Sequence, residues 1–182
     1  MSNPTTFRLP MLLKMAHSPV KNYIIPGVTS SLIGGNPGPG GCIRLFECER
    51  DHQENVTPHS HRFEFQCWVL QGSVTNRIWT TDSIHSTSAD LFELTEIKFD
   101  GMGKYERVTS ARAKYSYEDK TYNQGDWYRM TAAQIHSIKF SRGAIVLFFE
   151  GPTEFATSYI LEPVVDGIVI PTFKTEPWMF KK

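Results

Sequence analysis

Three histidines in this sequence are spaced so that they could bind one metal ion. His59 and His61 stand two residues apart before an aromatic-rich segment, and His136 comes much later. In an extended strand, residues i and i+2 face the same side, with Cβ atoms roughly 7 Å apart. Two imidazoles placed in this way can meet at one ion, and neutral imidazole suits iron, zinc, copper and nickel. Taken alone, the His-x-His pair is equally well interpreted as two surface histidines at the start of a strand.

Two glycines stand at matching distances from these histidines. Gly72 follows His61 by eleven residues, and His136 follows Gly125 by eleven residues. Glycine is favoured where the chain must turn sharply. The spacing predicts two ligand-bearing strands that are each bounded by a turn, with a tight hairpin at Gly72.

The surrounding sequence favours short strands over helices. Apolar and polar residues alternate at period two in many short runs that are rich in β-branched and aromatic residues, which is typical of half-buried strands. One helix is expected over residues 9–16. Strands are expected over residues 41–49, 63–70, 73–80, 90–99, 126–130, 135–140, 144–149 and 157–161. The pattern predicts an all-β protein, a single antiparallel β-sandwich or barrel of the jelly-roll kind.

The chain length favours one domain. With 182 residues there is no room for two domains of ordinary size. We expect residues 1–40 to form an N-terminal arm packed on the barrel, ending in a Gly/Pro-rich loop over residues 34–41, and residues 41–182 to form the barrel domain. Residues 102–122 are polar and irregular, and we expect a long hairpin or a lid there.

Composition excludes several classes of function. The 19 basic and 19 acidic residues give a net charge of zero, without the basic excess of a nucleic-acid-binding protein. No run approaches the roughly 20 apolar residues of a membrane-spanning helix, so we expect no membrane partner. Three cysteines without a C-x-x-C pair argue against a disulfide framework and a thiolate zinc site. The first residues lack a secretory signal pattern, and we expect a cytoplasmic protein.

With these motifs the sequence resembles the cupin superfamily, over residues 41–162. The first cupin motif is matched by His59, His61 and Gly72, and the second by Gly125 and His136. Other motif positions have drifted: Gln53 replaces a glycine, and Thr131, Ala133 and Phe140 replace a proline, a glycine and an asparagine. The resemblance implies a cupin jelly-roll barrel in which His59, His61 and His136 bind a divalent metal ion.

The position of the usual cupin glutamate ligand carries Phe65, seven residues before Gly72. Glu64 lies beside it, but the period-two rule places it on the opposite face of the strand unless a bulge turns it. The expected ligand set is therefore three histidines without a carboxylate, which leaves positions open for substrate and for dioxygen or water.

Within the cupins, a three-histidine site is similar to that of the thiol dioxygenases, such as cysteine dioxygenase. Residues 69–74 (VLQGSV) and 136–152 (HSIKFSRGAIVLFFEGP) are similar to corresponding segments of that family. The family's Ser, His and Tyr after the third ligand are replaced by Val146, Phe148 and Glu150. Arg44 is the candidate for its carboxylate-binding arginine.

Several side chains are predicted to surround the metal. Phe65, Val146 and Phe148 should form an apolar wall, and Cys67 shares their face as a buried thiol. Glu150 is the candidate general base, although it could instead mark the end of a strand. The candidate polar anchors for substrate are Arg62, Asn76, Arg77 and Tyr128. Trp68, on the outer face of its strand, is a candidate for a homodimer interface.

These observations favour a non-haem Fe(II) dioxygenase acting on a small organic substrate. Because the same imidazoles bind zinc and nickel, a zinc- or nickel-dependent isomerase, dehydratase or lyase is the alternative. A non-enzymatic cupin that binds a small ligand is a third reading of the same residues.

Overall fold

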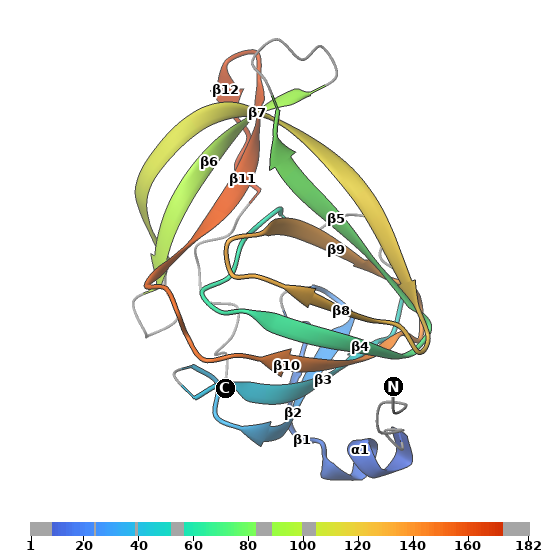
Figure 1. Cartoon of the computed structure of the whole chain (residues 1–182). Helices are drawn as coiled ribbons and strands as arrows, with labels where there is room; N and C mark the ends of the chain where they lie inside the picture. The colour runs from blue at the N-terminus through green and yellow to red at the C-terminus, as the bar shows by residue number, and fades with distance from the viewer. Residues whose placement is uncertain are drawn as a thin grey trace, which may run out of the picture.

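The computed structural model describes residues 9–23, 25–38, 40–51, 57–82, 89–99 and 105–172. Among them are one helix and twelve strands (Figure 1). The elements are α1 (Leu9–Met15), β1 (His17–Lys21), β2 (Val28–Gly35), β3 (Cys42–Cys48), β4 (Phe65–Gln71), β5 (Ser73–Thr81), β6 (Asp90–Phe99), β7 (Tyr105–Asn123), β8 (Trp127–Met130), β9 (Ile135–Phe140), β10 (Ile145–Glu150), β11 (Thr157–Val165) and β12 (Ile168–Val169).

The strands form two six-stranded antiparallel sheets. The first has the order β1-β2-β3-β10-β4-β8 and the second the order β12-β11-β6-β7-β5-β9. The chain crosses repeatedly from one sheet to the other after β4, so neighbours in sequence are often in different sheets. In Figure 1 the long strands β6 and β7 arch above the first sheet, with β11 beside β6. This is a double-sheet jelly roll, and the predicted all-β fold is confirmed.

The main core contains side chains of both sheets. In β4 the residues Phe65, Cys67 and Val69 are buried and alternate with partly exposed ones, as a strand with one face on a core requires. Val74 and Phe140 of the second sheet belong to the same buried cluster. This cluster forms the surroundings of the candidate site.

The segment before residue 40 contributes two strands to the first sheet. Strand β2 pairs with β3 over most of its length, and β1 pairs with β2. The helix α1 packs Leu12 with Leu45 and Leu147 in a second apolar cluster. Residues on both sides of position 40 therefore form one continuous sheet. The helix matches the expected one to within a residue.

Two sequence expectations are wrong. Residues 105–123, expected to be an irregular hairpin or lid, form the single 19-residue strand β7, which pairs with both β5 and β6; residues 102–104 lie outside the described residues. Most side chains of β7 are exposed on both faces, so its sequence lacks the alternation by which strands are recognised.

Gly72 makes no hairpin, because β4 and β5 lie in different sheets. Its positive φ of 71° instead allows the chain to cross between them.

No helix among the described residues is long and apolar enough to cross a membrane.

The second sheet contains an ion pair whose carboxylate is buried and whose arginine side chain is 38% exposed. The Glu162 carboxylate is fully buried and accepts two hydrogen bonds from the Arg107 guanidinium, at 2.7 and 3.0 Å, and one from the Thr172 amide. Arg107→Met removes both guanidinium hydrogen bonds from this buried carboxylate, so we expect a loss of about 1–3 kcal/mol in the free energy of unfolding. Urea denaturation measures it.

Arg112→Met is the matched control, because the Arg112–Glu93 pair is longer, at 3.4 Å, and its carboxylate side chain is 19% exposed, whereas that of Glu162 is fully buried. It should cost less than about 1 kcal/mol. Equal losses in the two variants would show that the Arg107–Glu162 pair has no special role.

Candidate metal centre

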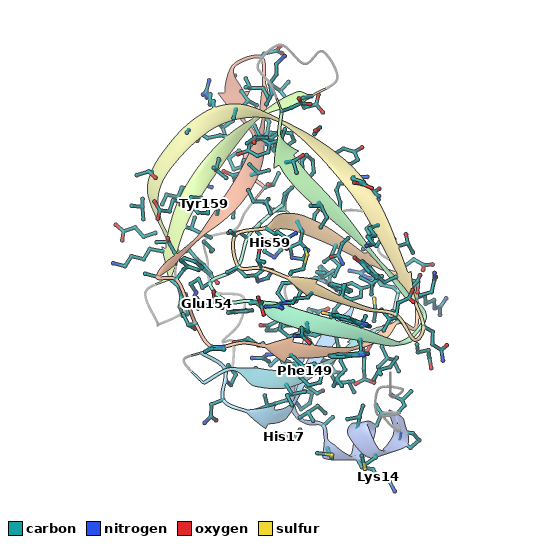
Figure 2. All side chains as sticks on the ribbon, in the orientation of Figure 1. Lys14, His17, His59, Phe149, Glu154 and Tyr159 are labelled. Atoms are coloured by element: carbon teal, nitrogen blue, oxygen red, sulfur yellow. The ribbon has the colours of Figure 1, made fainter. Side chains whose placement is uncertain are left out.

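Backbone hydrogen bonds hold the three histidines side by side. The amide of His59 donates to the carbonyl of His136, and the amide of His136 donates back, each at 2.9 Å. His61 is held by a bond of 3.0 Å from its amide to the carbonyl of Ala132. His136 lies on β9, whereas His59 and His61 lie in an extended segment before β4. Figure 2 shows His59 beside one end of β9.

The rings are oriented by hydrogen bonds from their outer nitrogens. Nδ1 of His59 lies 2.8 Å from the Thr57 carbonyl oxygen, and Nδ1 of His136 lies 3.0 Å from Oδ1 of Asn76. A carbonyl oxygen only accepts, so each Nδ1 carries the hydrogen and each Nε2 carries the lone pair. This is how metal-binding histidines are commonly oriented in proteins.

The remaining ring nitrogens converge. Nε2 of His61 and Nε2 of His136 are 2.9 Å apart, and one ligand atom from each of the three histidines lies within 4.8 Å of the others. Two nitrogen ligands at right angles, each about 2.0–2.1 Å from one ion, would lie ~2.9 Å apart. The donor set and its spacing therefore fit a single metal ion.

Burial keeps these imidazoles neutral. It lowers the pKa of His59, and it lowers the pKa of His61 and His136 well below the ordinary value. The neighbouring histidines lower the pKa of His61 and His136 further, because a second positive charge nearby is unfavourable. Only the neutral ring can bind a metal, so the site is ready to do so at neutral pH.

Phe65 lies against the cluster and Glu64 lies outside it. The Phe65 ring is edge-on to His61, with centroids 4.7 Å apart, and is 2% exposed. The Glu64 carboxylate accepts a hydrogen bond from Arg129 at 2.5 Å. Among the described residues, the candidate metal cluster contains the three histidines and no carboxylate.

A cavity of about 80 Å³ opens beside the three histidines. All four predicted wall residues (Phe65, Cys67, Val146 and Phe148) line it. Burial raises the pKa of Cys67 to about 12, so its thiol stays protonated at neutral pH. The candidate anchor Tyr128 also lines it. Further lining residues were not anticipated from the sequence: Tyr23, Ile25, Val28, Phe46, Ile138 and Phe140. Strand alternation could have indicated Phe140, because it lies on a predicted strand.

Glu150 and Arg62 do not line this cavity. The Glu150 carboxylate lies 3.7 Å from Nε of Arg44 and accepts hydrogen bonds from the Cys42 thiol and the Gly38 amide. The Arg62 guanidinium lies over the Phe99 ring, 4.9 Å from its centroid. Among the described residues, no Lys, Arg, Asp or Glu lines the cavity.

Three histidines thus gather beside the core of a double-sheet jelly roll, a fold class that includes the cupins among other proteins. No protein-family model matches the sequence, and no curated protein matches it significantly.

Several solved structures align with part of this chain. Streptomyces albus HEPD with 2-hydroxyethylphosphonate and Fe(II) bound aligns at a TM-score of 0.47 and 11% identity, over 78% of this chain and 25% of that one. An RmlC-like cupin from Shewanella frigidimarina aligns at 0.41 and 11%, over 85% and 97%. The Drosophila melanogaster CENP-C cupin domain aligns at 0.42 and 6%, over 74% of each chain. The chain thus spans a quarter of the first protein's length. Because these TM-scores lie below 0.5, the fold assignment rests on the strand topology of this chain.

Asn76 should set the metal affinity through His136. Asn76→Ala removes the acceptor that holds Nδ1 of His136, and we expect zinc to bind about 10- to 100-fold more weakly. Asn76→Asp keeps an acceptor oxygen at that place and should retain most of the affinity. Competition with a chromophoric chelator measures both. If the alanine variant bound zinc as tightly as the unchanged protein, Asn76 would have no orienting role.

Proposed function

We propose that this protein is a metal-dependent enzyme of the cupin class, a non-haem Fe(II) dioxygenase that acts on a small organic substrate. The observation that carries the proposal is the convergence of three neutral histidines, without a carboxylate, beside an apolar cavity. His59, His61 and His136 would hold the ion. Bound Fe(II) would supply the activation of dioxygen.

The residues of the chain have separate tasks in this proposal. Thr57 and Asn76 fix the rings of His59 and His136. The apolar walls exclude water, which strengthens electrostatic interactions within the site. Phe65 occupies the place beside the metal where a carboxylate would otherwise reduce the charge of the ion. The proposal assigns no step to Glu150 or Arg62, since each is engaged with partners away from the cavity.

The first test is metal content followed by oxygen uptake. Protein purified without chelators should contain about one iron per chain, and His59→Ala, His61→Ala or His136→Ala should lower that content to below about a tenth, since the ligands act together. Oxygen consumption over a panel of small organic substrates should depend on the same three residues.

His17→Ala is the matched control, because His17 lies on β1, away from His59 (Figure 2). It should leave metal content and oxygen uptake unchanged. Retention of zinc or nickel with no oxygen uptake over the panel would contradict the dioxygenase assignment and favour an isomerase, dehydratase or lyase. Metal content unaffected by the three substitutions would place the metal elsewhere.

The absence of a carboxylate ligand can be tested at two neighbouring positions. Glu64→Gln should change metal affinity little, because the Glu64 carboxylate binds Arg129. Phe65→Glu places a charged ligand against the histidines and should tighten binding of a divalent ion. Isothermal titration with zinc measures both. Loss of zinc binding in Glu64→Gln would show that Glu64 belongs to the site.

A further inference from the structure

The cavity beside the histidines offers few polar groups to a ligand. Apart from the three imidazoles, its lining contains the Cys67 thiol and the hydroxyls of Tyr23 and Tyr128. The Cys67 thiol is a weak hydrogen-bond donor. The Arg44 guanidinium lies over the Tyr23 ring, 5.3 Å from its centroid, which places this tyrosine beside a charged cluster. Tyr128, by contrast, packs against Phe65 and Tyr122 and pairs with Cys67 across the strands.

Tyr128 lies on β8, at the edge of the first sheet. It pairs with Cys67 across β8 and β4, so the two side chains share the face that lines the cavity. Its ring packs on Tyr122, with centroids 4.5 Å apart, and is edge-on to Phe65 at 6.4 Å. Because Phe65 in turn contacts His61 and His136, one aromatic ring separates Tyr128 from the histidine cluster.

The Tyr128 hydroxyl is buried near the Cys67 thiol and the Asn76 amide. The side chain is 4% exposed, and no described residue makes a hydrogen bond of full distance and angle with its oxygen. The Asn76 amide nitrogen is likewise buried without a partner, although Oδ1 of the same residue accepts from His136. Buried polar groups in folded proteins are nearly always hydrogen-bonded, and a buried unpaired donor is unfavourable. A ligand in the cavity would give this donor an acceptor.

We propose that Tyr128 is the specificity-determining residue of this cavity. Its hydroxyl donates a hydrogen bond to an acceptor oxygen of a small, otherwise apolar and uncharged substrate. This inference rests on the proposed function, in which the substrate lies beside the metal. The lining carries no Lys, Arg, Asp or Glu among the described residues, so no side chain offers a charged substrate group a counter-ion. A hydroxyl donor in a largely apolar cavity instead favours molecules with a carbonyl or ether oxygen.

The test compares two probes of the same shape on zinc-loaded protein. 2-Butanone carries a carbonyl oxygen, and 2-methyl-1-butene carries a methylene group in its place. We expect the unchanged protein to bind the ketone more tightly than the alkene. Tyr128→Phe should weaken ketone binding about three- to tenfold, the effect of one neutral hydrogen bond. It should leave alkene binding and zinc affinity unchanged. Ligand-observed NMR titration measures probe affinity without requiring catalysis.

Tyr122→Phe is the matched control, because Tyr122 packs on Tyr128 but is not among the residues lining the cavity. It should leave binding of both probes unchanged. Equal ketone affinity in Tyr128→Phe and the unchanged protein, or equal losses for ketone and alkene, would overturn the inference. Failure of the unchanged protein to bind zinc would overturn the proposed function instead. The same titrations on metal-free protein would then decide the role of Tyr128 separately.

Discussion

The candidate site depends on one pair of backbone hydrogen bonds, the reciprocal bonds between His59 and His136. In an antiparallel pair, residues that exchange both bonds lie directly opposite and point to the same face. His59 also bridges to Ile160 of β11, so its segment lies between β9 and β11 and links two strands of the second sheet. The contact that joins these strands is therefore also the contact that brings two imidazoles together.

The second condition for metal binding at this site is the exclusion of water from the three imidazoles. Three imidazoles this close together repel one another when charged, and burial opposes their protonation for an independent reason. Both effects act in the same direction and leave neutral rings with converging lone pairs. An aromatic ring at position 65 maintains this condition, whereas a carboxylate there would favour protonated histidines when no metal is bound.

Much of this arrangement could be predicted from the sequence, and the reasons for success are local. Strands β6 and β9 have the expected bounds because their own alternation determines which face is buried. His59 and His61 were expected to face the same side because residues i and i+2 of a regular strand do so. In the structure these residues lie in an extended segment with a single bridging residue, and this expectation needs only the extended backbone.

The features that the sequence could not predict depend on distant partners. Strand β7 is defined by pairing with β5 and β6, because its own polar side chains show no preferred face. Tyr23 lines the cavity from the N-terminal segment, where no strand was expected. Glu150 faces Arg44 because the register pairs Phe148 with Arg44 and Glu150 with Cys42. That register joins segments about a hundred residues apart, and no short-range pattern encodes it.

The bridge at His59 also determines when the site can form during folding. His59 and His136 are 77 residues apart in sequence, the difference between their numbers, and contacts between distant residues form slowly because the loop between them must first be closed. The two rings meet only after β9 has found its place and the segment before β4 has docked on it. An ion bound by one histidine of the unfolded chain would gain the other two ligands only late in folding. Binding of the ion by all three histidines would therefore indicate that the two sheets have already assembled.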